Sequence, residues 1–435
     1  MAETDFLPGP TAVRNRIATL DIVRGVALFG ILLMNITAFG LPHAYSDPSV
    51  YGGAEGADRW SWIITSMFFE GTQRGLFTLL FGAGVILMTA SLEASGRPNA
   101  QDIYFRRNLW LVVFGVIHGF VLLWTGEILF YYGVTALFVY GLRNARPRTL
   151  LGLAIGGLVL TMAWNGLDTW NGLRKHREYV VADSLKTAGD SLTAEQAGAI
   201  EAWQGMVKEY KPDSAKIQKE IDAKQGSYWD VMKFQAPQLT RFQSWWLYRY
   251  FFDYFSMMLI GMVLFKAGII TAQRPAGFYW KLVLLGYGVG LTVNWFEVSH
   301  ILREDFSVLS FLRTAVTYDL GRIPMTIGHL GMLMLFARGS WFGWLRNSLA
   351  AVGRMAFTNY IMTSILCALV FYGFGFGLYG ELQRHQLYYV VGGIWLLQLV
   401  VSPLWLARYR FGPLEWLWRG LTYGEMPAMR RGGEP

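Results

Sequence analysis

The chain has 435 residues, of which 53% are apolar and 16% are charged, and its formal net charge is +8 at pH 7. Soluble domains usually contain about 25% charged residues, so composition excludes a set of soluble domains although the length would permit one. The apolar content also excludes intrinsic disorder, and the single cysteine, Cys367, excludes a disulfide scaffold. We therefore expect an all-α integral membrane protein.

Apolar runs long enough to cross a bilayer recur along the chain. A spanning helix needs roughly 20 mostly apolar residues. No small-residue cleavage site follows the first run, so we expect it to be retained as a span rather than removed as a signal peptide. The pattern predicts a helical bundle of about ten transmembrane helices, at residues 18–40, 75–92, 107–125, 127–142, 149–168, 248–270, 279–299, 311–337, 349–372 and 387–407.

Basic residues are distributed unevenly between alternate connections, and Lys and Arg accumulate in cytoplasmic loops. With the N-terminus inside, the inner loops hold clusters such as Arg143, Arg146 and Arg148, whereas outer segments hold acids such as Asp47 and Glu55. The pattern predicts an N-in, C-in, multi-pass protein of the bacterial cytoplasmic (inner) membrane, with a basic cytoplasmic tail and membrane lipids as neighbours. Because orientation explains the positive charge, nucleic-acid binding has no support.

Residues 169–247 form a long hydrophilic region, which this orientation places outside the cytoplasm. Thr193 and Gln196 have the spacing of a capping box and predict a helix through Glu209. A second helix is expected at residues 213–224. We interpret the region as a small helical cap, or as a lid over an outward-facing site. The chain is thereby divided into an N-terminal transmembrane half (1–168), the extracytoplasmic cap (169–247) and a C-terminal transmembrane half (248–435).

The first span carries polar residues that a bilayer should exclude. Asp21 and Arg24 are three residues apart and share one helix face near the cytoplasmic end. They form either a structural ion pair or a site in which Arg24 binds an anionic donor group from the cytoplasmic side. Asn35, in the outer half, either holds helices together or belongs to a site. His43 follows in the outer connection.

The third span contains His118, roughly level with Asn35, and Glu127 follows at the outer edge. A histidine in an apolar helix is either a hydrogen-bonded packing residue or a general base, since imidazole titrates near neutral pH. A carboxylate one or two helical turns away could orient or charge the imidazole. The pair is therefore a candidate for acid–base chemistry.

The eighth span is the most irregular, because Gly321 and Pro324 are expected to break the helix. Asp319 and Arg322 flank that point and must be paired or hydrated. They form either an internal salt bridge that stabilises the kink or the wall of a polar cavity.

Several short blocks combine glycine, arginine and aromatic residues in a distinctive order: residues 20–27, 30–35, 79–84, 115–119, 353–360, 411–419 and 421–423. Together these blocks closely resemble the YeiB-type family of bacterial membrane proteins. The resemblance covers both ends of the chain and leaves out the cap. That family looks like a branch of the transmembrane acyltransferases that include the lysosomal heparan-glucosaminide N-acetyltransferase.

The resemblance implies transfer of an acyl group, such as acetyl, from cytoplasmic acyl-CoA to a sugar amine or hydroxyl across the membrane. It implies that Asn35 matches an asparagine of the acyltransferase motif. His43 is the nearest match to the catalytic histidine of that motif, at a shorter spacing. His118 lies in the YeiB-type motif itself and is the rival base, with Glu127 beside it.

The same resemblance suggests where the substrates bind. CoA is polyanionic, so arginines near the cytoplasm are expected to hold acetyl-CoA or another acyl-CoA as co-substrate. The acceptor is expected to be a small molecule or a glycan, no metal is expected, and a homodimer is left open. The donor site is assigned to Asp21, Arg24, Arg106, Arg107 and Arg354, and the substrate cavity to Asp319, Arg322 and Asn359.

Two other functions remain open. A small-molecule or lipid transporter of the inner membrane would use Asp319, Arg322 and His329 for coupling or substrate binding. A scaffold would keep these residues as contacts between helices. Consumption of acyl-CoA would favour the enzyme, flux into liposomes without it would favour the transporter, and neither would favour the scaffold.

Overall fold

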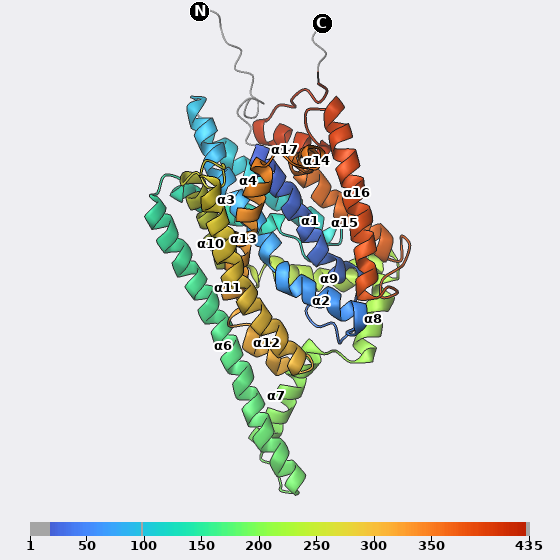
Figure 1. Ribbon diagram of the computed structural model, residues 1–435. Helices are drawn as coiled ribbons and strands as arrows, with labels where there is room; N and C mark the ends of the chain where they lie inside the picture. The colour runs from blue at the N-terminus through green and yellow to red at the C-terminus, as the bar shows by residue number, and fades with distance from the viewer. Residues whose placement is uncertain (1–17, 97–98, 432–435) are drawn as a thin grey trace, which may run out of the picture.

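The computed structural model describes residues 18–96 and 99–431, and its regular structure there is helical apart from one isolated bridge, Tyr409 with Arg430. The all-α fold is thus confirmed (Figure 1). In chain order the elements are α1 (Ala18–Gly40), α2 (Gly56–Phe68), α3 (Thr72–Ala94), α4 (Ala100–Phe120), α5 (Leu129–Val139), η2 (Tyr140–Leu142), α6 (Pro147–Ala188), α7 (Ala194–Tyr210), α8 (Ser214–Lys224), α9 (Tyr228–Gln243), α10 (Leu247–Lys266), α11 (Ala276–Arg303), α12 (Val308–Thr314), α13 (Tyr318–Arg338), α14 (Gly343–Arg354), α15 (Ala356–Phe371), α16 (Arg384–Arg408) and α17 (Pro413–Tyr423).

In the described part of the chain, six helical stretches are long and apolar enough to cross a membrane. They are α1, α2 with α3, α6, α11, α13 and α16; a seventh forms if α14 and α15 count as one span bent by 84°. Each predicted apolar run lies on a helix or a helix pair, but several of these helices are too short or too polar to meet the same criterion. The protein is a helical membrane protein, while ten spans and the N-in, C-in orientation stay predictions.

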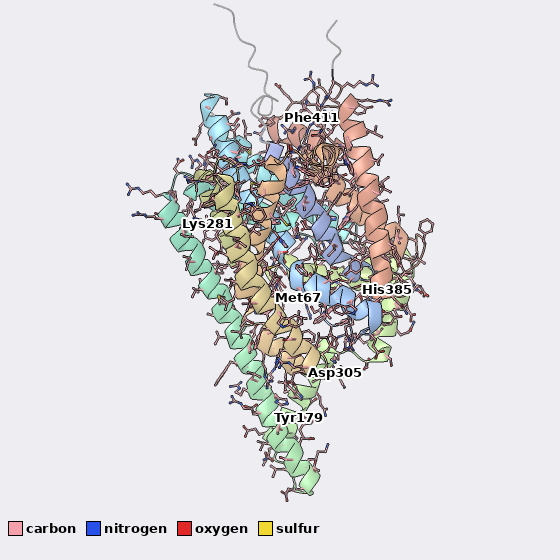
Figure 2. The ribbon with its side chains drawn as sticks, viewed as in Figure 1. Met67, Tyr179, Lys281, Asp305, His385 and Phe411 are labelled. Carbon is pink, nitrogen blue, oxygen red and sulfur yellow. The ribbon has the colours of Figure 1, made fainter. Side chains whose placement is uncertain are left out.

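The start of α1 and helix α17 lie at the same end of the bundle, here termed the terminal end (Figure 1). Helices α6 and α7 form a hairpin that projects from the opposite end, where Figure 2 labels Tyr179 of α6. Helix α8 lies at one side of the bundle, and α9 runs across it in this view (Figure 1). In the predicted N-in, C-in orientation, the terminal end would face the cytoplasm.

Helix α6 runs without a break for 42 residues, so the predicted boundary after residue 168 falls inside it. No proline follows in the sequence until Pro212. The helix ends at Gly189, whose left-handed φ of 86° glycine adopts without strain. The two expected cap helices are present as α7, which opens on the Thr193–Gln196 capping box, and α8.

The break expected at Gly321 and Pro324 was wrong. Helix α13 continues through Pro324, and the chain is interrupted earlier, between α12 and α13. A Cβ atom on Gly286 of α11 would overlap the backbone of Gly328 in α13. This close backbone contact packs α13 against α11 at Gly328, one turn beyond the proline. The sharp bend of the bundle lies instead between α14 and α15.

Helices α1 and α14 cross in direct backbone contact. A Cβ atom on Gly25 would overlap the carbonyl oxygen of Leu349, and one on Gly353 would overlap that of Asp21. Glycine at both positions is what permits this approach. Arg24 and Arg354 are the sequence neighbours of these glycines, so the crossing brings both to one place. Arg24 Nη1 lies 3.4 Å from the Gly353 carbonyl oxygen, to which it donates.

The cap is joined to the membrane helices through Glu220 of α8. His43 Nδ1 lies 2.5 Å from one carboxylate oxygen, and the other accepts from the Tyr379 hydroxyl at 2.6 Å and lies 3.4 Å from Lys224 Nζ. Burial raises the pKa of Glu220, but the His43 imidazole, the Lys224 ammonium and the Tyr379 hydroxyl outweigh it and lower the pKa to about 2. The structure therefore uses His43 to hold the cap.

The α1–α14 contact predicts that Gly353→Ala destabilises the bundle. The added Cβ meets the carbonyl of Asp21, which cannot move without separating the two helices. We expect the melting temperature in detergent to fall by several degrees. The control is Gly392→Ala on α16, where a Cβ meets nothing within 4 Å, and alanine favours the helix by up to about 1 kcal/mol. Equal melting temperatures for the two variants would contradict the prediction.

The cap predicts a loss of stability in acid. The pKa of Glu220 is about 2 in the folded protein and about 4.3 in an unfolded chain. Its stabilising charge is therefore fully present above about pH 5 and is lost as the pH falls toward 2. Between pH 6 and pH 3 the wild-type melting temperature should fall further than that of Glu220→Gln. Asp222→Asn, which alters an exposed carboxylate on the same helix, should follow the wild type; parallel curves for wild type and Glu220→Gln would refute the prediction.

Candidate functional site

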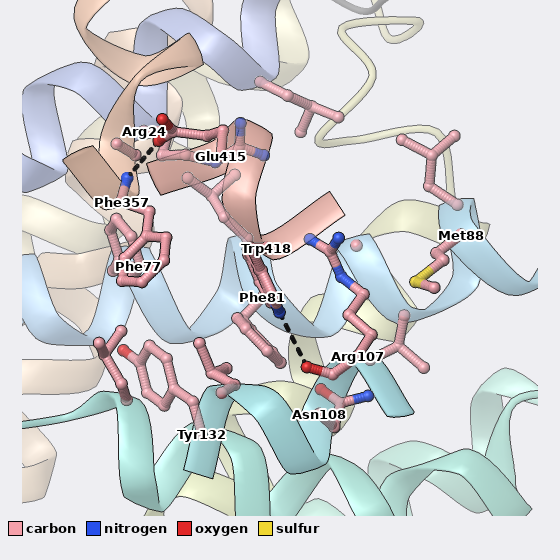
Figure 3. A pocket seen from close by; sticks show the side chains of 18 of the residues that line it. Arg24, Phe77, Phe81, Met88, Arg107, Asn108, Tyr132, Phe357, Glu415 and Trp418 are labelled. Atoms are coloured by element: carbon pink, nitrogen blue, oxygen red, sulfur yellow. Dashed lines mark hydrogen bonds between the residues drawn. The ribbon is translucent and has the colours of Figure 1, made fainter. Parts of the chain in front are cut away.

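A cavity of about 440 Å³ lies among helices α1, α3, α4, α5, α14, α15 and α17. Figure 3 shows Phe77 and Phe81 from α3, Tyr132 from α5 and Trp418 from α17 around it. Most of the residues in its wall are apolar or aromatic, while its charged residues come from α1, α4, α14 and α17. The cavity therefore has one charged part and one apolar part.

The charged part has an excess of positive side chains. Two carboxylates, those of Asp21 and Glu415, face the cavity together with four arginines: Arg24, Arg107, Arg354 and Arg419. Arg24 donates to Asp21 over 2.9 Å. The guanidinium carbon of Arg107 lies 3.7 Å from the centre of a Trp418 ring, and the Trp418 indole donates to the Arg107 carbonyl over 2.9 Å. This packing holds a cation at the wall, where an anionic ligand would be favoured.

Glu415 has a structural task. Its carboxylate accepts from the backbone N–H groups of Phe357 and Thr358, over 2.7 Å and 3.1 Å, and from the Thr358 hydroxyl over 2.6 Å. These donors lie in the first turn of α15, so the carboxylate caps that helix directly after the α14–α15 bend. These hydrogen bonds fix the second carboxylate of the cavity in place, and the four arginines outnumber the two carboxylates.

The apolar part ends near Tyr360, where a second, smaller cavity of about 10 Å³ begins. The two cavities share Ile31 and Tyr360 as wall residues. Asn35 and Ser364 line the smaller one, together with Trp124. Asn35 was predicted from the sequence as a site residue, and the structure places it at this inner end.

His118 adjoins the smaller cavity through Ser364. His118 Nε2 and Ser364 Oγ are 2.8 Å apart, and His118 Nδ1 is 3.9 Å from Glu127 Oε1. The edge of the His118 ring packs on Tyr360, with ring centres 4.9 Å apart. The His118, Glu127 and Ser364 side chains are buried. The predicted His118–Glu127 pair is therefore close in space, although 3.9 Å is too long for a hydrogen bond.

Ser364 was missed by the sequence reasoning, because an isolated serine in an apolar helix carries no pattern. Its neighbour Thr363 behaves as such residues usually do and donates to the carbonyl of Asn359, four residues earlier, over 2.8 Å. Ser364 instead bonds to a histidine 246 positions away in the chain. Tertiary contact alone identifies it.

Some predicted site residues lie elsewhere. Asp21, Arg24, Arg107 and Arg354 line the large cavity, but Arg106 is exposed and donates to the Thr422 carbonyl over 3.4 Å. His43 lines neither cavity, because it is paired with Glu220 of the cap. The structure therefore brings His118, and not His43, to the cavity that Asn35 lines.

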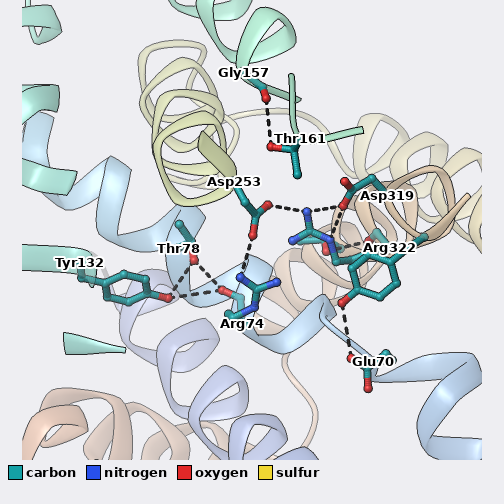
Figure 4. Close-up of polar contacts among 11 residues, drawn as sticks. Glu70, Arg74, Thr78, Tyr132, Gly157, Thr161, Asp253, Asp319 and Arg322 are labelled. Atoms are coloured by element: carbon teal, nitrogen blue, oxygen red, sulfur yellow. Dashed lines mark hydrogen bonds and ion pairs between the residues drawn. The ribbon is translucent and has the colours of Figure 1, made fainter. Parts of the chain in front are cut away.

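The residues predicted for the substrate cavity also lie outside both cavities. Asp319 accepts from Arg322 over 2.6 Å, and the same guanidinium donates to Asp253 over 2.5 Å. Asp253 accepts in turn from Arg74 over 2.7 Å, which completes a charge network between α3, α10 and α13 (Figure 4). The Asp319–Arg322 salt bridge is thus present at the irregular span. Arg74 and Asp253 were not singled out in the sequence, although a charge in an apolar run was the available signal.

Asn359 and His329 also serve helix contacts. Asn359 donates to the Val352 carbonyl over 3.1 Å and to Ser402 Oγ over 3.0 Å, which joins α14, α15 and α16. His329 Nδ1 lies 2.8 Å from the Tyr287 hydroxyl and Nε2 lies 2.7 Å from the Phe68 carbonyl oxygen. Both ring nitrogens of His329 are therefore occupied.

Known proteins similar to this chain share nearly its whole length. The chain is 30% identical to uncharacterized protein YeiB of Escherichia coli (strain K12), over 94% of this chain and 96% of that protein. It is 29% identical to uncharacterized protein YxaH of Bacillus subtilis (strain 168), over 95% and 96%. No solved structure matches the chain. Residues 264–425 match the family described as protein of unknown function (DUF418). Since its identity to YeiB extends over nearly the whole length of both proteins, the chain belongs to the YeiB family.

Proposed function

We propose that this protein is a transmembrane acyltransferase that moves an acyl group from cytoplasmic acyl-CoA to an extracytoplasmic acceptor, a sugar amine or hydroxyl. The observation that carries the proposal is the division of one cavity into an arginine-rich part and an apolar part that ends beside a buried histidine. Acyl-CoA has a matching division, with anionic phosphates at one end and a thioester at the end of an uncharged arm. With the predicted N-in orientation, the arginines face the cytoplasm.

The donor would bind with its phosphates on the guanidinium groups of Arg24, Arg107, Arg354 and Arg419. Charge-assisted hydrogen bonds to phosphate are strong, and Arg107 is already held in place by Trp418. The pantetheine arm would lie along Phe77 and Phe81 toward Tyr360, so that the thioester reaches the end of the cavity beside His118. Burial of the methylene groups of this arm would contribute about 0.8 kcal/mol for each CH₂.

Acyl transfer needs a base and donors for the developing oxyanion. His118 supplies the base, since its Nε2 already lies at hydrogen-bond distance from a hydroxyl. The Asn35 amide lines the same small cavity and can donate without a charge in the apolar interior. Glu127 lies close enough to stabilise an imidazolium and is itself fixed by the N–H groups of Leu129 and Phe130.

Removal of the base tests the chemistry. His118→Ala should lower transfer of label from [¹⁴C]acetyl-CoA into membrane lipids and glycans by about 10²- to 10⁴-fold, the usual contribution of a general base. His176→Ala on α6, which removes a histidine packed on Trp203 and outside both cavities, should keep the wild-type rate. Flux of a solute into proteoliposomes without acyl-CoA consumption would instead support the transporter.

Removal of a cavity cation tests the donor site. Arg107→Met keeps an apolar stem against Trp418 but removes the charge, so we expect the Kd for acetyl-CoA to rise about tenfold. Added salt should weaken binding to the wild type more than to Arg107→Met. Arg148→Gln at the exposed start of α6 serves as the charge-matched control. Identical Kd values for Arg107→Met and the wild type would show that Arg107 does not contribute to the donor site.

A further inference from the structure

We propose that Ser364 is the nucleophile of a two-step transfer and carries the acyl group as an ester between donor and acceptor. The inference rests on the proposed acyltransferase function and deepens it. Its basis is the order Ser364–His118–Glu127, a hydroxyl, an imidazole and a carboxylate with separations of 2.8 Å and 3.9 Å. Nucleophile, base and a third group that orients the base form the recurrent arrangement of covalent acyl transfer.

The position of Ser364 suits a relay. It lines the small cavity, which meets the arginine-bearing cavity at Tyr360 and Ile31. A pantetheine arm that reaches Tyr360 would bring the thioester toward Ser364, while the CoA phosphates stay with the arginines. The ester would then hold the acyl group at Ser364 after CoA leaves. A covalent intermediate therefore lets donor and acceptor use the small cavity in turn.

The hydrogen-bond pattern favours a serine that donates to the imidazole. If Ser364 Oγ–H donates to Nε2, the proton on Nδ1 faces the Glu127 carboxylate, which is an electrostatically favourable tautomer. Nδ1 is buried and makes no hydrogen bond to the residues that the structure describes. The Nδ1–H group can therefore donate toward the Glu127 carboxylate when Nε2 accepts a proton and the imidazole becomes positively charged.

Two further buried donors lie at the walls of the same small cavity. The indole Nε1 of Trp124 and the hydroxyl of Tyr360 interact with each other, and the hydroxyl also interacts with the Ile128 backbone, but neither contact has the geometry of a full hydrogen bond. Buried polar groups are nearly always paired, so each such group calls for an explanation. Stabilisation of a tetrahedral oxyanion at Ser364, together with the Asn35 amide, would use these donors.

Bonds and protons are conserved in each of the two steps. In the first, Ser364 Oγ attacks the thioester carbonyl, His118 Nε2 takes the hydroxyl proton, the C–S bond breaks and the proton passes to the CoA sulfur. This step leaves acyl-O-Ser364 and free CoA thiol. In the second, the acceptor hydroxyl or amine attacks the ester carbonyl, His118 takes its proton and returns it to Ser364 Oγ as the C–O bond breaks. No oxidant, reductant or metal enters either step.

The test uses the full-length protein with labelled acetyl-, octanoyl- or palmitoyl-CoA and no acceptor. We expect up to one acyl group per chain, an equal release of CoA thiol, and peptide mass spectrometry that locates the label on Ser364. Ser364→Ala should carry no label and should lower turnover at least about a hundredfold. Ser364→Cys should carry the acyl group as a thioester that neutral hydroxylamine cleaves, which keeps the test valid if the alanine variant folds poorly.

The matched control is Ser256→Ala. Ser256 is also a buried serine, on α10, and it lines neither cavity; this variant should be labelled like the wild type. Label on His118, or acceptor acylation at the wild-type rate by Ser364→Ala, would overturn the serine relay and leave the acyltransferase proposal standing. If the wild type neither binds nor consumes any of the three acyl-CoA probes, both proposals fail.

Discussion

The backbone contact between α1 and α14 is the constraint on which the rest of the site depends. Gly25 and Gly353 let the two helices meet at the level of their carbonyl groups, and an arginine follows or precedes each glycine in the sequence. The contact therefore gathers cations as it packs helices. The 84° bend that follows α14 then turns α15 into the bundle, which carries Tyr360 and Ser364 to the inner end of the cavity.

Charged side chains inside this apolar bundle have two kinds of surroundings. Around α13 the charges of Arg74, Arg322, Asp253 and Asp319 bond to one another, and such a network joins helices that could not otherwise bury ions. Glu415, in the wall of the large cavity, accepts hydrogen bonds from the first turn of α15, and Glu127, beside His118, accepts them from that of α5. Each carboxylate stabilises the N-terminus of a helix and keeps its negative charge. The wall of the large cavity still carries a net positive charge, because its four arginines outnumber its two carboxylates.

The site could be predicted where its signal was local. Asp21, Arg24, Asn35, His118 and Glu127 stood out because each is polar within or beside an apolar run, and the structure places all five in or beside the two cavities. Other assignments failed because a polar residue in a membrane helix can equally serve a neighbouring helix. His43 binds the cap, and Asn359 bonds to α14 and α16.

Composition and local pattern alone predicted the helical membrane class, a helix at each apolar run, and helices α7 and α8 of the cap with the capping box of α7. Apolar periodicity and caps act within a few residues, so they can be read without knowledge of the fold. Tertiary structure alone decided that α13 continues through Pro324, that α14 and α15 diverge at Met355, and that Ser364 meets His118. The physical reason is range: these outcomes depend on contacts between residues far apart in the chain, which no local propensity encodes.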